Sequence, residues 1–383
     1  MNVPESNHRF SRSVPIVCTA LLGLGLGLVG TADAQISLPV GSGSATVSVF
    51  VAGGLNSPRG LKFGPDGNLY VAEAGTGSTD TNPAPADDFG NCTAGLEGPG
   101  QYYGSPIGSR ISQIDRDGNV TTFVDNLPSS EASGLVSGVA DVAFIGNMMY
   151  AVLAGSGCSH GVSTPNGVLR VNHDGSVTMI ADLSAYQKAN PVANPTDPVN
   201  GDFEPDGTWY SMIAVRGDLY AVEPNHGEVV KVTTSGDISR VVDISATFGH
   251  VVPTSIAYHG NFYVGNLDEF IIPDGSSKVF KITPSGNIRI DTKGFSVVTG
   301  VVFDGRARMY VLEATDSQTL QSPGQIVRVD PSGRQTVIVT GLTYPSAMTM
   351  GPDGNLYVSN VGFYLGPPLP PGSGQIIKVK LRD

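Results

Sequence analysis

The chain has 383 residues with 50 Gly and 27 Pro, and only 15% of its residues are charged, against roughly 25% in an average soluble domain. This turn-rich, charge-poor composition favours a folded all-β protein, and the lack of a Gly-X-Y period excludes collagen. The net charge of −12 argues against nucleic-acid binding, because affinity for phosphates comes chiefly from Lys and Arg.

The N-terminus has the pattern of a secretory signal peptide. Arg9 and Arg12 precede an apolar run over 16–29, and small residues follow, ending at Ala34. The run is too short and too Gly-rich for a membrane span, and no second run follows it. We therefore expect cleavage near Ala34, a mature chain without a membrane span, and a secreted or periplasmic location.

The chain has three cysteines, and cleavage of the signal peptide would remove one of them. Cys18 lies within the signal, so Cys92 and Cys158 remain in the mature chain. An even pair of cysteines in an exported protein is a disulfide candidate. We expect a Cys92–Cys158 disulfide that ties together loops of two neighbouring repeats.

An internal repeat is the strongest signal in the chain. The phrase Gly-Pro-Asp-Gly-Asn-Leu-Tyr-Val occurs at 64–71 and again at 351–358, and weaker copies place Tyr at 150, 220, 263 and 310. The spacing indicates a unit of about 45 residues, with insertions in the first two copies, which is typical of a propeller blade. Asp-Gly or Ser-Gly turns between β-forming runs predict four antiparallel strands, A to D, in each unit.

The sixth unit lacks a fourth strand, and the start of the mature chain supplies a candidate. The run 45–52 alternates like an outer strand and precedes the first unit. Pairing it with the last unit would close the ring and remove an exposed edge. The sequence therefore predicts a signal peptide over 1–34, a linker over 35–44 and a six-bladed β-propeller over 45–383, closed by this N-terminal strand.

Strand direction places the long insertions on one face. If strand A runs from top to bottom, the A–B and C–D turns lie at the bottom, and the B–C and D–A loops lie at the top. The long segments 74–108, 154–166, 184–206 and 362–374 are all top loops. Loops on a rigid scaffold commonly carry binding sites, so we expect function on the top face.

The same face collects polar residues just after strand B of several units. These candidate ligand-binding residues are Glu73, Glu223, Asn225, His226, His250, Asn266, Glu313 and Asn360. A ring of oxygen donors from Glu73, Glu223, Asn266 and Glu313 would suit Ca²⁺, the one cofactor that the sequence suggests. The alternative is that these side chains only cap strands and bond to loop backbone.

One catalytic motif is discounted. Gly157-Cys-Ser-His-Gly161 matches the G-x-S-x-G nucleophile elbow, but that elbow requires a strand-to-helix turn and no helix of useful length is expected there.

Several segments resemble a known family. The repeat phrase, together with the segments at 210–212, 223–227, 249–254 and 263–267, is similar to the ScyD/ScyE family of exported propellers and, more distantly, to NHL, TolB-like and SMP-30/gluconolactonase propellers. The resemblance covers roughly residues 45–383 and implies an exported six-bladed propeller. It carries over no catalytic residue.

Two functions from different classes follow. The first is a binding or scaffold propeller whose top face recognises a small molecule, a glycan or a protein. The alternative is a metal-assisted hydrolase or lyase, in which a top-face cation polarises a lactone or ester oxygen and His226 or His250 moves the proton.

Overall fold

The structure is a computed structural model that describes residues 45–77, 102–196, 203–269, 272–315, 322–362 and 369–382. The chain divides into two units, Met1–Asp33 and Ala34–Asp383, and every described residue belongs to the second. The expected signal peptide and linker therefore lie outside the described residues. Within the described ranges, no helix combines the length and apolarity needed to cross a membrane.

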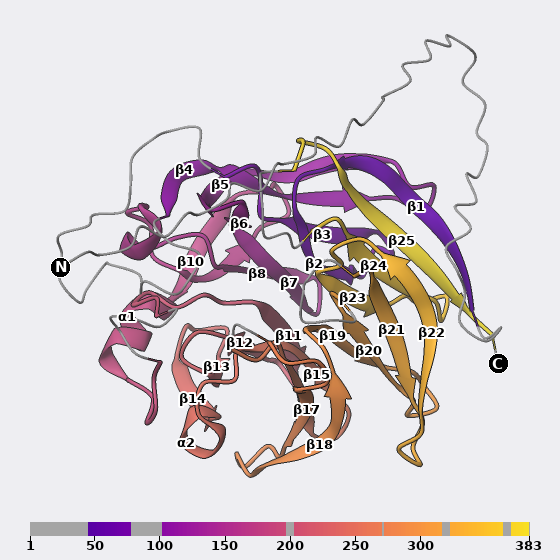
Figure 1. Cartoon of the computed structure of the whole chain (residues 1–383). Helices are drawn as coiled ribbons and strands as arrows, with labels where there is room; N and C mark the ends of the chain where they lie inside the picture. The colour runs from indigo at the N-terminus through magenta and orange to yellow at the C-terminus, as the bar shows by residue number, and fades with distance from the viewer. Residues whose placement is uncertain are drawn as a thin grey trace, which may run out of the picture. The chain divides into compact units, whose positions relative to one another are not determined.

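Six antiparallel sheets form the six blades (Figure 1). Blades 1 and 2 contain β2 (Pro58–Phe63), β3 (Leu69–Glu73), β4 (Tyr103–Ile114), β5 (Val120–Ala132) and β6 (Leu135–Ser137), then β7 (Val139–Ile145), β8 (Met148–Leu153), β9 (Gly167–Val171) and β10 (Val177–Asp182). Blades 3 and 4 contain β11 (Ser211–Val215), β12 (Asp218–Glu223), β13 (Glu228–Val232) and β14 (Ile238–Asp243), then β15 (Pro253–Tyr258), β16 (Phe262–Asn266), β17 (Ser277–Ile282) and β18 (Ile288–Phe295). Blades 5 and 6 contain β19 (Val298–Phe303), β20 (Met309–Glu313), β21 (Gly324–Val329) and β22 (Gln335–Leu342), then β23 (Ala347–Met350), β24 (Leu356–Asn360), β25 (Gly374–Leu381) and β1 (Ala45–Leu55).

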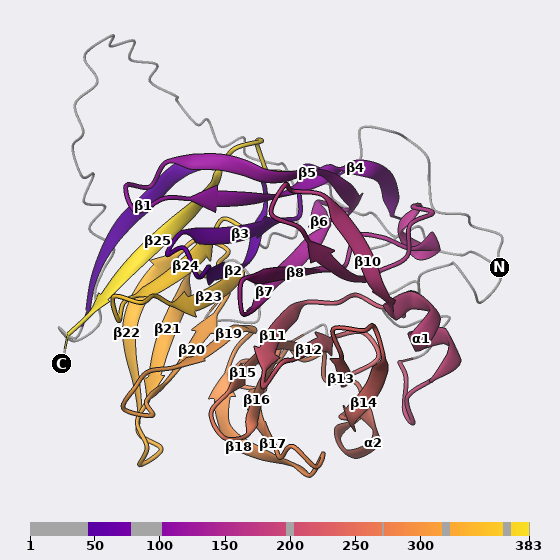
Figure 2. The ribbon, with the colours of Figure 1, turned by 180° about the vertical axis from the view of Figure 1, so that it is seen from behind.

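The N-terminal strand closes the ring as predicted. β1 pairs antiparallel with β25, so that Ala45 lies opposite Leu381 and Val47 opposite Val379. The two strands lie side by side in both views (Figures 1 and 2). The innermost strands contact one another in sequence around the ring, and β2 of blade 1 contacts β23 of blade 6. The predicted six-bladed propeller is therefore confirmed.

Blade 1 departs from the four-strand pattern. Its sheet has five strands, because β5 continues past its usual length and the chain turns back through Gly134, at φ 89°, into β6. Positive φ is easily reached by glycine, which lacks a Cβ. The described top loops also contain α1 (Leu183–Ala189), α2 (Ser245–Phe248) and the 3₁₀ helix η1 (Cys158–His160).

The repeat phrase has a local structural cause. In blades 1 and 6 the turn Asp accepts from the backbone N–H of the following Asn at 3.1 Å, and the strand-B Tyr donates to the same Asp. These bonds join Tyr70 to Asp66 at 2.9 Å and Tyr357 to Asp353 at 3.0 Å. The phrase therefore encodes a bottom turn locked to its own strand.

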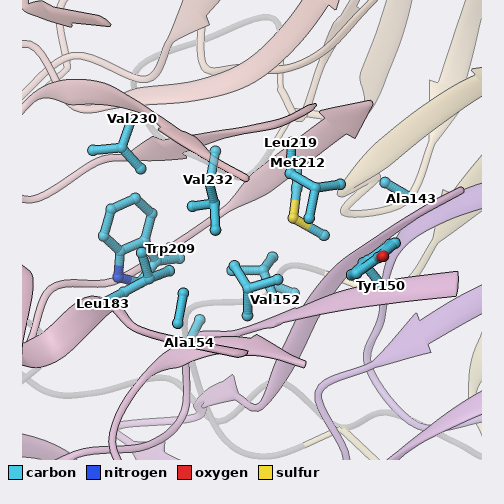
Figure 3. Close-up of a cluster of buried hydrophobic side chains, with 14 residues drawn as sticks. Ala143, Tyr150, Val152, Ala154, Leu183, Trp209, Met212, Leu219, Val230 and Val232 are labelled. Atoms are coloured by element: carbon cyan, nitrogen blue, oxygen red, sulfur yellow. The ribbon is translucent and has the colours of Figure 1, made fainter. Parts of the chain in front are cut away.

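The hydrophobic core lies between neighbouring blades. Six clusters of buried apolar side chains occupy the six blade interfaces, and Figure 3 shows the one between blades 2 and 3. There Trp209, only 1% exposed, lies beside Leu183, and Val152 and Met212 belong to the same cluster. Since each blade contributes to two clusters, the ring holds its inner strands in fixed positions around the axis.

Candidate functional site

The polar residues that end the B strands bind backbone groups of the top loops. Glu73, Glu223, Asn266, Glu313 and Asn360 are the last residues of β3, β12, β16, β20 and β24. The side chain of each forms a hydrogen bond with the backbone of the D–A loop that precedes its blade. In the same order, the bonded backbone atoms are Asn56 N at 2.6 Å, Thr208 N at 2.7 Å, Val251 O at 2.8 Å, Ser296 N at 2.6 Å and Thr343 N at 2.8 Å. Their polar atoms therefore fix loops at the top of five of the six blades.

Four of these residues also bond to strand C of their own blade. The partners are Arg110 Nε at 2.9 Å for Glu73, Lys278 N at 2.6 Å for Asn266, Gln325 Nε2 at 2.8 Å for Glu313 and Gln375 Oε1 at 3.0 Å for Asn360. Blade 2 has Leu153 at this position. A buried polar group has to be paired, and these bonds pair them.

The expected calcium ring has no counterpart in this arrangement. Within the described ranges, no three His, Cys, Asp or Glu side chains lie close enough together to hold a metal ion. The oxygens of Glu73, Glu223, Asn266 and Glu313 accept from N–H donors, whereas Ca²⁺ needs 6–8 oxygens converging on one point. These four residues do not fit a shared metal site.

Three of the expected residues gather around the loop that enters blade 3. The backbone N–H of Glu204 donates to Asn225 Oδ1 at 2.6 Å, and the Glu204 carbonyl lies 2.9 Å from His226 Nε2. The Phe203 and His226 rings are 4.9 Å apart. Burial raises the pKa of Glu223 to about 7, although N–H donors from Thr208, His226 and Asn225 favour its ionised form. Asn225, His226 and Glu223 therefore hold this loop.

His226 and His250 lie close enough to affect each other. Burial lowers the pKa of His226, and the neighbouring His250 lowers it further. The imidazole of His226 is 4% exposed and already bonds to Glu204 O, so His226 is built into the loop. The acid–base role expected for His226 or His250 stays a prediction.

A second cluster was not foreseen from the sequence. The Tyr102 phenol donates to Glu204 Oε1 at 3.0 Å, and Glu204 Oε2 lies 3.2 Å from His160 Nε2. The Tyr102 and His160 rings are 4.3 Å apart, and both residues are 0% exposed. Burial and the adjacent Glu204 raise the pKa of Tyr102. Tyr102, Glu204 and His160, which come from three separate top loops, form a buried chain of ionisable groups.

The neighbouring Asp206 fixes the loop that carries His160. Its Oδ2 accepts from Ser159 N at 2.8 Å and lies 3.2 Å from Cys158 Sγ, and its Oδ1 lies 2.9 Å from Lys188 Nζ. Ser159 is fully buried in η1, and no strand-to-helix elbow presents it. Cys92 lies outside the described residues, so the Cys92–Cys158 disulfide stays a prediction.

A central tunnel runs between the inner strands of the six blades and contains a cavity of about 220 Å³. Its wall mixes polar and apolar side chains, among them Lys62, Asp141, Tyr210, Ser211, Ile213, Ser255, Ala257, Thr299, Val301, Ala347 and Thr349. The cavity is smaller than the roughly 300–1,000 Å³ of pockets for drug-sized ligands.

Lys62 and Asp141 form an ion pair on the tunnel wall, where blades 1 and 2 meet. Lys62 Nζ lies 3.5 Å from Asp141 Oδ1, with the two side chains 27% and 2% exposed. Asp141 Oδ2 accepts from Met212 N at 2.9 Å and from Ser211 Oγ at 3.1 Å, both on β11. The carboxylate therefore connects three blades from inside the tunnel.

Arg59 and Tyr210 join the tunnel to the buried cluster. The Arg59 guanidinium donates to the carbonyl of Val136 and bonds to Tyr210. Burial raises the pKa of Tyr210 to about 12, and the charge of Arg59 acts on the phenols of both Tyr210 and Tyr102. The chain formed by Tyr102, Glu204 and His160 thus lies next to the end of the tunnel.

The sequence held only weak signals for these residues. Lys62 and Asp141 are charged residues inside apolar runs, and alternation along an inner strand would place them on the tunnel side. Tyr102, His160 and Glu204 lie in insertions of different blades, so no local pattern links them. The strand-end residues could be identified from the sequence because they recur at one position of the repeat.

Comparisons with known proteins support the fold. No protein-family model and no curated protein matches the chain. Among solved structures, it is similar to an oxidoreductase of the glucose dehydrogenase type from Thermus thermophilus, with 17% identity and a TM-score of 0.53 over 88% of this chain and 99% of that one. It is also similar to a gluconolactonase from Xanthomonas campestris, with 10% identity and a TM-score of 0.52 over 91% of this chain and 94% of that one. A third similar structure is the PQQ-bound aldose sugar dehydrogenase from Streptomyces coelicolor, with 13% identity and a TM-score of 0.52 over 89% of this chain and 100% of that one. At these identities the likeness establishes a shared six-bladed fold, and membership of the ScyD/ScyE family stays a prediction.

Proposed function

We propose that this protein is a propeller that binds a small molecule in its central tunnel. The observation that carries the proposal is the cavity of about 220 Å³ with a polar and apolar wall contributed by all six inner strands. A concave site with a few converging polar groups on a rigid frame is the usual form of a ligand site. The names of the similar structures, a glucose dehydrogenase and a gluconolactonase, favour a small molecule over a scaffold role.

Filling the tunnel tests this proposal. Ala347 on β23 is half-buried, lines the cavity and borders the apolar cluster between blades 1 and 6, so Ala347→Phe would add a ring at the cavity wall. The matched control is Ala246→Phe, at an exposed position of α2. The probes are myo-inositol, gluconate, serine and glucono-δ-lactone, measured by saturation-transfer NMR and calorimetry.

We expect at least one probe to bind the unaltered protein and the Ala246→Phe variant, and to lose binding in Ala347→Phe. The proposal fails if no probe binds. It also fails if every probe that binds does so equally well to both variants.

A second candidate function is acid–base hydrolysis of a lactone or ester. It is favoured by the buried chain of Tyr102, Glu204 and His160 beside the tunnel. In such a reaction a base accepts a proton from water, the water oxygen bonds to the carbonyl carbon, and the departing oxygen receives a proton as the C–O bond breaks. The described residues supply groups for the proton steps, and the expected top-face cation has no site among them.

Rates with glucono-δ-lactone and phenyl acetate, with and without a chelator, test this candidate. Glu204→Gln should lower any enzymatic rate at least about 100-fold, in line with general acid–base catalysis. The control Glu269→Gln, at an exposed position, should leave the rate unchanged. The candidate is rejected if neither substrate is turned over or if Glu204→Gln retains the full rate.

Export of the protein also belongs to the proposal. It rests on the signal-like residues 1–34, which lie outside the described residues, and a secreted or periplasmic location stays a prediction.

A further inference from the structure

The charges of the tunnel wall constrain what it can hold. Among the residues that line the cavity, Lys62 and Asp141 carry formal charges of opposite sign, and their charged atoms are 3.5 Å apart. The lining therefore has no net charge. A guest carboxylate attracted to Lys62 would lie beside Asp141, and a guest ammonium attracted to Asp141 would lie beside Lys62, so the pair does not select an ion.

The two partners differ in how fully they are paired. Asp141 accepts from three other groups, namely Val142 N at 2.8 Å, Met212 N at 2.9 Å and Ser211 Oγ at 3.1 Å. Lys62 has three N–H donors and, within the described part of the chain, a single partner at the outer limit of hydrogen-bond distance. Its ammonium group is therefore available to a guest.

Hydroxyl groups make up most of the remaining polar wall. Tyr210, Ser211, Ser255, Thr299 and Thr349 come from four different blades. The Tyr210, Ser211 and Thr299 hydroxyls donate to Ser346 O, Asp141 Oδ2 and Pro345 O, so each offers its oxygen as an acceptor to a guest hydroxyl.

Apolar side chains alternate with these hydroxyls. Ile213, Ala257 and Val301 belong to the same lining. A wall of this kind suits a molecule with C–H surfaces between hydroxyl groups, because it pairs the hydroxyls and shields the C–H groups from water.

We propose that the occupant of the tunnel is an uncharged molecule with neighbouring hydroxyl groups, of the polyol or cyclic sugar class, held by Lys62, whose ammonium group Asp141 orients. One guest hydroxyl accepts from Lys62 Nζ, while the oxygens of Asp141 are occupied by Lys62, Val142, Met212 and Ser211. This inference rests on the proposed function and goes beyond it in naming the ligand class.

The experiment compares myo-inositol, an uncharged polyol, with gluconate, an anion, and serine, a zwitterion. Lys62→Met keeps the length of the side chain and removes its donors. The matched control is Lys231→Met, whose lysine forms a similar pair with Asp218 at 3.6 Å and whose residue does not line the tunnel. Binding is measured by calorimetry on the purified mature protein.

We expect myo-inositol to bind most tightly, and Lys62→Met to weaken it at least about tenfold, as expected for one hydrogen bond to a charged group. Lys231→Met should leave the affinity unchanged. The inference is overturned if myo-inositol does not bind, if gluconate or serine binds more tightly, or if Lys62→Met has no effect.

The Ala347→Phe variant separates this inference from the proposed function. If gluconate or serine binds more tightly and Ala347→Phe abolishes that binding, the tunnel is the ligand site and the polyol class is wrong. If the probes that bind are insensitive to Ala347→Phe, both proposals are wrong.

Discussion

The carboxylate of Asp141 lies directly against the backbone of Gly60, where a Cβ on the glycine would stand 1.9 Å from Oδ1. No side chain larger than hydrogen fits at that place. Gly60 therefore lets the carboxylate approach β2, where Lys62 can reach it, while the same carboxylate binds β11. The pair that we assign to ligand binding depends on this close approach.

We expect Gly60→Ala to lower the free energy of unfolding by about 1–3 kcal/mol, because the methyl group would force Asp141 away from its partners. Urea unfolding measures the change. Gly305→Ala is the control, since a Cβ there meets no atom within 4 Å. Equal stability of the two variants would show that Asp141 can move at little cost.

The bonds of Asn266 predict a structural rather than a metal-binding role. Asn266→Ala would remove the acceptor of the Lys278 N–H and leave the Val251 carbonyl with only Asp268 N at 3.2 Å, and should cost about 1–3 kcal/mol. Asn147→Ala, at an exposed turn position, should change the stability by less than about 0.5 kcal/mol. If Ca²⁺ stabilised the native protein and Asn266→Ala abolished that stabilisation, the result would support the metal-ring hypothesis instead.

Glu223 predicts a pH dependence of stability. Its pKa is about 7 in the folded protein, against an ordinary value of 4.5. Between these values the folded protein holds a proton that the unfolded chain has released. The contribution of Glu223 is therefore most favourable below about pH 4.5 and is lost as the pH rises through about 7.

The unfolding free energy of the unaltered protein minus that of Glu223→Gln isolates this effect. We expect the difference to fall between pH 4.5 and 7 and to stay level above pH 7. A difference that does not vary with pH over this range would mean that Glu223 is ionised when folded.

The repeated Tyr–Asp bond at the bottom turns should contribute to stability in each blade that has it. Tyr357→Phe removes the bond to Asp353 and should cost about 1 kcal/mol. Tyr70→Phe should cost at least as much, because Gln113 Nε2 also bonds to the Tyr70 hydroxyl at 2.8 Å. No loss of stability in either variant would contradict a locking role for the phrase.

The predicted disulfide has a direct chemical test. Alkylation of the exported protein without reductant should label neither Cys92 nor Cys158, and both should be labelled after reduction, as read by mass spectrometry. Two labelled cysteines before reduction would disprove the bridge.

The fold was predictable because each repeat carries its own turn chemistry. Asp66 and Asp353 each accept hydrogen bonds from the Asn two residues later and from the strand-B Tyr, so identical residues form identical turns. The closing strand was predictable from the missing strand of the last unit. The fifth strand of blade 1 was not, because nothing in residues 135–137 distinguishes a strand from the end of a loop.

The site was less predictable for a different reason. Carboxylates at strand ends look alike in a sequence whether they bind a metal or backbone N–H groups, and the partners of Glu73 and Glu313 are backbone N–H groups, which every residue except proline carries. The pairing of Tyr102 with Glu204 joins residues 102 positions apart. Only the fold brings such residues together.

A crystal structure of the mature protein grown with myo-inositol tests the central claim most directly. We predict a ring of density in the tunnel between the inner strands, within hydrogen-bond distance of Lys62 Nζ. Ordered myo-inositol among the top loops, with only water bonded to Lys62 Nζ, would contradict the account.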